Sequence, residues 1–163
     1  MKRPSPGKRA RGFTLIELMV VLVLISIMSA VIVGEMGGTF HEALLRSTGR
    51  RLISVFSLAS SRAISLDRTH QVRFDRATGH YAVETRRHGD FVPVEAVGGS
   101  EGTIDSHIIL RLRGEGLKDA IAFYPDGTAD EREIELRDPE GFGLALRINP
   151  VTSRVQLMEL ERQ

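Results

Sequence analysis

The chain has 163 residues, of which 42% are hydrophobic and 26% charged, so its size suits one modest globular domain plus an appended segment. It contains no cysteine, which excludes disulfides, cysteine-ligated zinc, iron–sulfur clusters and thiol nucleophiles. The net charge of +1 argues against nucleic-acid binding driven by overall basicity, because neutralising phosphates requires a surplus of Lys and Arg.

The charge is unevenly distributed along the chain. Residues 1–12 carry five basic side chains and no acidic one, which leaves 17 basic against 21 acidic residues for the remainder, a net charge of −4. Residues 13–33 follow, and Glu17 is the one charged side chain among them. As an α-helix this stretch would span about 31 Å, enough to cross the hydrocarbon core of a bilayer. The basic leader predicts a cytoplasmic N-terminus and an exported C-terminal domain.

Glu17 is the unusual feature of this predicted transmembrane helix. An ionised carboxylate inside an apolar helix costs about 2.5–3.5 kcal/mol on insertion scales, and no Lys, Arg or His lies within a helical turn of it. Its side chain either extends to the membrane interface or pairs with a cation on another chain. A cleaved secretory signal is disfavoured because the apolar run exceeds about 7–15 residues and Ser29-Ala30 lies inside it.

The helix is expected to continue over residues 34–66. From residue 41 onward the apolar positions recur at helical spacing and form one stripe that faces a core, namely Leu45, Leu52, Phe56, Ala59, Ala63 and Leu66. Five arginines surround this stripe: Arg46, Arg50, Arg51, Arg62 and Arg68. We interpret them as a solvated helix face rather than a nucleic-acid surface, so no nucleic-acid partner is expected.

Residues 67–163 are predicted to form a globular β domain. Apolar residues alternate in short segments separated by turns such as residues 76–79, 125–127, 138–141 and 149–150, which predicts about seven or eight short strands. The segments at 72–74 and 80–85 predict a hairpin. Residues 91–94 predict an edge strand, because Pro93 cannot donate to a ladder, and residues 98–102 predict a flexible loop. The fold class is therefore α+β, one long helix packed on antiparallel sheet.

The junction between the leader and the apolar run resembles a known signal. Gly12-Phe13-Thr14-Leu15-Ile16-Glu17-Leu18, after a short basic leader, is similar to the class III signal of type IV pilins and type II secretion pseudopilins. The resemblance implies that a prepilin peptidase cuts after Gly12 and N-methylates Phe13. It also implies that Glu17 meets the new N-terminal amine of a neighbouring subunit, which would supply the missing cation.

Segments of the predicted β domain resemble a particular branch of this family. Residues 57–64, 72–74, 121–128 and 149–155 are similar to the H-type minor pseudopilin of type II secretion, and related type IV minor pilins share the layout. Two departures are Ser153, where the last hairpin often has glycine, and the absence of the cysteine pair that many type IV minor pilins carry. The missing pair favours the secretion branch.

The resemblance implies a domain plan and a set of partners. The plan is a removed leader (1–12), a transmembrane and assembly helix (13–33), its periplasmic continuation (34–66) and the β domain (67–163). The expected partners are other pseudopilins, the prepilin peptidase, the inner-membrane secretion platform and the membrane. The expected location is the bacterial inner membrane, and a periplasmic filament after assembly. A type IV pilus minor pilin, acting in pilus assembly or DNA uptake, is the alternative.

A signal-anchored periplasmic enzyme or binding domain is the hypothesis from another class. Such a protein would keep residues 1–12 and tolerate replacement of Glu17. No nucleophile elbow, Walker loop or H-E-x-x-H motif is present. The five histidines show no metal-ligand spacing on one helix or strand face, and each is predicted to lie on the surface or in a loop: His41, His70, His80, His88 and His107. No catalytic residue, metal or cofactor is therefore expected.

Overall fold

The computed structural model describes residues 13–94, 98–114 and 119–161, and for residues 30–39 it describes the backbone alone. The chain divides into two units, Met1–Thr39 and Phe40–Gln163. The second unit is called the head. The predicted α+β fold is confirmed, since one long helix is accompanied in the described residues by two antiparallel sheets.

The helix α1 runs over Leu15–Ser65, and the periodicity from residue 41 onward predicted its second half. In the head it buries Leu45, Leu52, Phe56, Ala59 and Ala63 completely. These five residues are therefore the core-facing stripe expected from the sequence.

Leu66 does not belong to this stripe, and its prediction was wrong. Its side chain is 53% exposed. The amide of Arg68 donates to the carbonyl of Ala63 at 3.1 Å and that of Asp67 to the carbonyl of Ile64 at 3.4 Å, which is the Schellman pattern that ends a helix. Asp67 adopts the left-handed conformation that this ending requires, with φ of 49°. Leu66 thus lies where the chain turns away from the core.

Among the described residues, no helix combines the length and the apolar character needed to cross a membrane. The predicted span, residues 13–33, ends among positions whose side chains lie outside the described part of the chain.

The first sheet contains five strands in the described residues. Its hydrogen-bonded order is β3-β2-β1-β6, and β4 pairs with β2 beside β3. All of its pairings are antiparallel, and the predicted hairpin of β1 and β2 is confirmed by the pairing of Val72 with Val83. The strands are β1 (His70–Phe74), β2 (His80–Arg87), β3 (Asp90–Pro93), β4 (Glu101–Thr103) and β6 (Ala120–Phe123).

The two short strands β3 and β4 both pair with β2. The edge strand is confirmed, since β3 ends the strand order and Pro93 is its last residue. The prediction of a flexible loop at residues 98–102 was wrong at its end. Glu101 and Gly102 belong to β4 and pair with Ala82 and Tyr81 of β2. A Cβ on Gly102 would overlap the Tyr81 hydroxyl, so glycine allows this close approach.

The second sheet is four-stranded and antiparallel, in the order β5-β7-β8-β9. Between β5 and β7 the chain crosses to the first sheet to form β6 and then returns. Along β7, Ile134 and Leu136 face the core and pair with Leu146 and Leu144 of β8. The strands are β5 (Ile109–Arg113), β7 (Arg132–Arg137), β8 (Gly143–Ile148) and β9 (Val155–Leu160).

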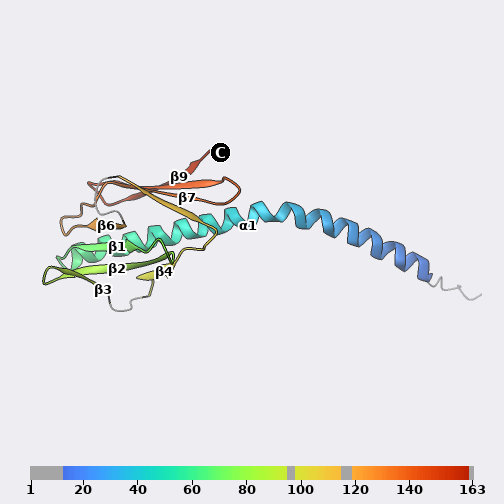
Figure 1. Ribbon diagram of the computed structural model, residues 1–163, viewed down its shortest axis with the longest axis horizontal. Helices are drawn as coiled ribbons and strands as arrows, with labels where there is room; N and C mark the ends of the chain where they lie inside the picture. Colours follow the sequence, from blue (N-terminus) through green and yellow to red (C-terminus); the bar gives the residue numbers. More distant parts are fainter. Residues whose placement is uncertain (1–12, 95–97, 115–118, 162–163) are drawn as a thin grey trace, which may run out of the picture. The chain divides into compact units, whose positions relative to one another are not determined.

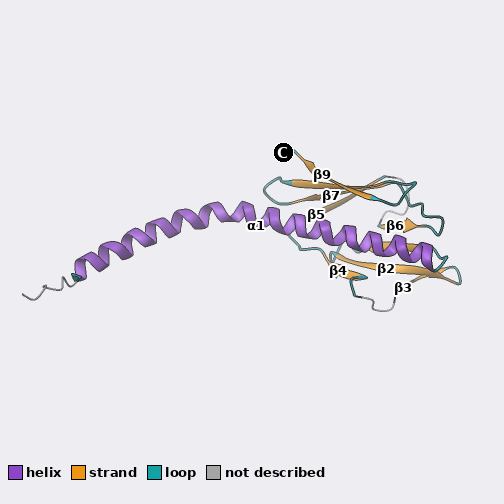
Figure 2. Cartoon of the chain, turned by 180° about the vertical axis from the view of Figure 1, so that it is seen from behind, coloured by secondary structure: helices purple, strands orange, loops and turns teal. Residues whose placement is uncertain are grey.

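Within the head, α1 lies between the two sheets in both views (Figures 1 and 2). Towards the first sheet, the Phe56 ring lies 6.3 Å from that of Phe74 and 6.0 Å from that of Phe123. Towards the second sheet, Gly49 is buried and lets the helix approach Leu144 and Leu157 closely. The helix therefore supplies one core that both sheets share.

Ser153 was noted above as a departure from the glycine expected in the last hairpin. The backbone conformation of Ser153 explains why glycine suits this position. Its φ of 55° lies in the left-handed region, which glycine adopts at no steric cost. The hydroxyl of Ser153 donates to the carbonyl of Gly127 at 2.6 Å, and its amide donates to the carbonyl of Asn149 at 2.9 Å. These contacts hold the serine in the conformation that the β8–β9 turn requires.

Candidate functional site

The helix α1 begins with a side-chain cap. The hydroxyl oxygen of Thr14 accepts a hydrogen bond from the amide of Glu17 at 3.3 Å. Thr14 is the residue before the helix and Glu17 its third residue, so Thr-Leu-Ile-Glu has the spacing of a capping box. Thr14 was not among the residues predicted from the sequence, although its S/T-x-x-E spacing indicates a helix cap.

Glu17 lies in the first turn of α1. A carboxylate there is favoured by the positive end of the helix dipole and by the unpaired amides of the first turn. Among the described residues, none provides a side-chain hydrogen bond or an ion pair to this carboxylate. The helix dipole can stabilise an exposed carboxylate by about 0.3–1 kcal/mol, which is less than the cost of placing one in hydrocarbon.

The described residues around Glu17 present a largely apolar surface. Each is between 46% (Val21) and 82% (Phe13) exposed, on all sides of the helix: Phe13, Leu15, Ile16, Leu18, Met19, Val20, Val21, Leu22, Val23, Leu24, Ile25, Ile27 and Met28. The hydroxyl of Ser26 donates to the carbonyl of Leu22 at 2.8 Å, so this polar group is satisfied within the helix. A helix that is apolar all round requires an apolar environment or neighbouring helices.

Of the three residues predicted for processing and assembly, the structure describes two. Phe13 and Glu17 are exposed at the start of the segment, whereas Gly12 lies outside the described residues. Phe13 lies two residues before the first residue of α1, and Glu17 is the third residue of that helix. The roles of all three residues stay predictions.

On the head, charged side chains cover the outer face of the second sheet. Glu135 of β7 is 5% exposed, and its carboxylate pairs with Arg113 at 2.9 Å and with Arg137 at 2.5 Å. The hydrogen bond from Arg137, together with the positive charge of Arg113, lowers the pKa of Glu135. Arg147 and Glu133 form a further pair at 2.7 Å. This face is therefore a network of paired charges.

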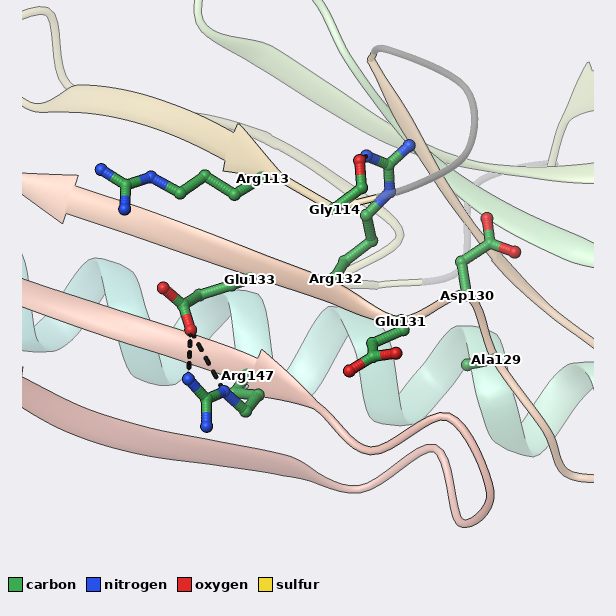
Figure 3. A pocket seen from close by; sticks show the side chains of 8 residues that line it. All are labelled: Arg113, Gly114, Ala129, Asp130, Glu131, Arg132, Glu133 and Arg147. Atoms are coloured by element: carbon green, nitrogen blue, oxygen red, sulfur yellow. Dashed lines mark hydrogen bonds and ion pairs between the residues drawn. The ribbon is translucent and has the colours of Figure 1, made fainter.

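A concavity of about 920 Å³ adjoins this network (Figure 3). Arg132 donates to the carbonyl of Gly114 at 2.7 Å, and the Arg147–Glu133 pair lies at the other side. The described residues that line it include three carboxylates, Asp130, Glu131 and Glu133, but no serine, threonine or histidine. They are Arg113, Gly114, Ala129, Asp130, Glu131, Arg132, Glu133 and Arg147. Asp130 accepts hydrogen bonds from the Ala122 amide and the Tyr124 hydroxyl.

The histidines occupy different environments. His70 is fully buried in β1, so its predicted surface or loop position was wrong. Its Nδ1 lies 2.8 Å from the carbonyl oxygen of Arg68. Burial lowers its pKa, and the positive charges of Arg62 and Arg68 add to that effect. Among the described residues, no three His, Asp or Glu side chains are placed to hold a metal ion together.

Comparison with known proteins identifies both the N-terminal segment and the fold. Residues 7–33 match the family described as the Prokaryotic N-terminal methylation motif. This match includes Gly12, Phe13 and Glu17. No curated protein shows significant sequence similarity to the chain.

Several solved structures share the fold. The minor pseudopilin EpsH from the type 2 secretion system of Vibrio cholerae aligns with a TM-score of 0.58 and 11% identity, over 71% of this chain and 95% of that one. The type IV minor pilin FimU of Pseudomonas aeruginosa aligns with a TM-score of 0.57 and 16% identity, over 72% and 93%. Escherichia coli GspH aligns with a TM-score of 0.57 and 15% identity, over 72% and 89%.

The chain has the fold of minor pilin-like proteins. Together with the methylation motif, this confirms the resemblance that residues 12–18 suggested. At these identities the likeness establishes the architecture alone. The neighbours are pilin-like structural proteins.

Proposed function

We propose that this chain is a minor pseudopilin of the H type, a non-enzymatic subunit of a short periplasmic filament that helps a type II secretion system export folded proteins. The observation that carries the proposal is the combination of a methylation motif over residues 7–33 with a head that shares the fold of EpsH and GspH. The missing cysteine pair supports the secretion branch.

In this proposal, processing at the leader creates the partner that Glu17 lacks. A prepilin peptidase hydrolyses the peptide bond between Gly12 and Phe13, and the new α-amine of Phe13 is methylated. A methylated amine can still be protonated, and an α-amine has a pKa of about 7.7–8.0. The resulting cation of one subunit pairs with the Glu17 carboxylate of the next. Because leaving either charge unpaired in an apolar environment is costly, the pair fixes the axial position of adjacent subunits.

The apolar surface around Glu17 has two successive roles in this proposal. Residues 13–33 first anchor the subunit in the inner membrane as a single span, with the leader in the cytoplasm and the head in the periplasm. After extraction by the inner-membrane platform, the same surface packs against the helices of other pseudopilins. The exposure of this surface on every side, from Phe13 to Met28, suits both environments.

The proposal is tested with Glu17→Gln, which removes the charge and keeps the size. Mass spectrometry of the membrane-extracted chain should show normal processing, because the peptidase acts at Gly12 and Phe13. Recovery of the variant in the sheared filament fraction should fall by about 10-fold or more, since a neutral amide cannot pair with the amine. Ser26→Ala is the matched control, because its hydroxyl bonds within its own helix. Unchanged recovery of the Glu17→Gln chain would contradict the assembly role.

The second candidate is a minor pilin of a type IV pilus, which the alignment with FimU favours. Both candidates predict the same processing and the same dependence on Glu17, so the filament itself must separate them. Pull-down of the crosslinked chain from its native host should recover secretion pseudopilins under our proposal. Recovery of pilus subunits instead would favour the second candidate.

A further inference from the structure

Four side chains from three separate segments meet at one place on the head. His41 belongs to α1, Asp105 and His107 to the connection between β4 and β5, and Glu140 to the turn between β7 and β8. The imidazole rings of His41 and His107 lie 6.3 Å apart between centres, with 33° between their planes. The sequence separates these residues by up to about a hundred positions, so only the fold brings them together.

Each imidazole is held by a carboxylate through the same ring atom. Nδ1 of His41 lies 3.1 Å from Oε1 of Glu140, and Nδ1 of His107 lies 2.7 Å from Oδ1 of Asp105. An ionised carboxylate can only accept a hydrogen bond, so Nδ1 must be the protonated atom of each ring. In the neutral imidazole, Nε2 then carries the free lone pair.

This arrangement is the second shell that histidine ligands of a metal usually have. A metal-bound histidine typically donates its other ring N–H to a carboxylate or carbonyl, which fixes the tautomer and the ring orientation. Two imidazoles bound to one zinc ion at about 2.0–2.1 Å per bond and near the tetrahedral angle have ring centres roughly 5 Å apart. The observed 6.3 Å is roughly 1 Å longer, so binding would draw the two rings together. The His107 side chain is 66% exposed, so its ring can move together with the exposed carboxylate that holds it.

We propose that His41 and His107 bind a divalent late transition metal such as Zn²⁺ through Nε2, with Glu140 and Asp105 as the carboxylates that orient the two rings. Within the described part of the chain, no third His, Asp or Glu completes a ligand set, so water supplies the remaining positions. Imidazole nitrogen selects Zn²⁺, Ni²⁺ and Cu²⁺ over Mg²⁺ and Ca²⁺, which prefer oxygen.

A metal at this site would tie α1 to the β4–β5 connection. The chain has no cysteine, so no disulfide can provide such a tie. Binding to the folded state alone stabilises that state in proportion to the logarithm of the metal concentration. The head would therefore be more stable in the presence of the metal, and the proposal is independent of the assembly role of residues 13–33.

The test uses the untagged full-length chain in detergent micelles, because a polyhistidine tag would bind the same metals. Calorimetric titration with ZnCl₂ should show one site per chain, and thermal unfolding followed by circular dichroism should shift upward with zinc. His41→Gln and His107→Gln should each weaken zinc binding more than about 10-fold, because each removes one of two protein ligands. Glu140→Gln should weaken it by about 10–100-fold, as expected for loss of an orienting carboxylate.

His88→Asn is the matched control, since His88 is exposed elsewhere and asparagine tolerates its φ of 51°. Electron paramagnetic resonance of the Cu²⁺ complex provides a second measurement that does not depend on variant stability, and it should show two coordinated nitrogens. The proposal is overturned if His88→Asn weakens zinc binding as much as His41→Gln does. It is equally overturned if Mg²⁺ stabilises the head as well as Zn²⁺ does, or if copper shows no nitrogen ligand.

Discussion

Thr14 and Glu17 show how one short segment can serve both the local fold and a function. The spacing Thr-x-x-Glu caps α1 through the hydroxyl of Thr14. Glu17 adds a favourable charge at the helix start without using its carboxylate in any side-chain bond among the described residues. Its carboxylate therefore remains available to another chain. Local helix chemistry and intersubunit pairing do not compete for the same atoms.

Replacing Thr14 tests the cap. Thr14→Ala should destabilise the first turn of α1 by about 1 kcal/mol, because it removes the acceptor for the Glu17 amide. The expected result is faster hydrogen exchange at the amides of residues 15–18 in the full-length chain. Thr14→Ser keeps the hydroxyl and should exchange like the wild type. Equal exchange in all three chains would show that the cap contributes nothing.

His70 predicts a pH dependence of stability. Burial lowers its pKa in the folded state below the ordinary value of 6.5, and the charges of Arg62 and Arg68 act in the same direction. The unfolded chain therefore binds the proton more readily, and stability that is full above about pH 6.5 declines as the pH falls. The unfolding midpoint should therefore drop as the pH falls from about 6.5 to about 5.5. His70→Asn cannot take up the proton, and should reduce this slope; an unchanged slope would contradict the assignment.

At the scale of elements, Gly49 controls how closely α1 approaches the second sheet. A Cβ at this position would lie 3.3 Å from Cδ1 of Leu157 and 3.6 Å from Cδ1 of Leu144. In a helix a glycine costs about 1 kcal/mol relative to alanine. The close contact between helix and sheet that glycine permits offsets this cost.

Enlarging Gly49 should therefore weaken the head. Gly49→Leu is expected to destabilise it by about 1–3 kcal/mol through overpacking, measured by denaturant unfolding of the full-length chain. Ala43→Leu introduces the same side chain at an exposed position of α1 and should change stability by less than about 0.5 kcal/mol. Similar stability of the two variants would show that the sheet can move away from the helix without cost.

The sequence predicted the individual elements better than their arrangement. The stripe from Leu45 to Ala63 and the β1–β2 hairpin follow from local periodicity, which a single sequence records. The crossing of β6 into the first sheet depends on its pairing with β1, about fifty residues away, which no local pattern specifies. The three-residue β4 was missed because Gly98-Gly99-Ser100 indicates a loop and Glu101–Thr103 is too short to alternate.

The candidate site divides in the same way. Gly12, Phe13 and Glu17 could be named from sequence because their signal is contiguous and independent of the tertiary fold. Burial of His70, by contrast, follows from its place in a central strand, and the meeting of His41 with His107 follows from the packing of distant segments. Such positions become visible only in the folded molecule.

For the whole molecule, the central claim is that residues 1–12 are removed and that the mature chain assembles through its new N-terminus. The most direct measurement is the intact mass of the full chain extracted from membranes of a host that contains a prepilin peptidase. Our account predicts a chain that begins at Phe13 and carries one additional methyl group. A mass that still includes residues 1–12 would contradict it, and would instead indicate a head held permanently by an uncleaved anchor.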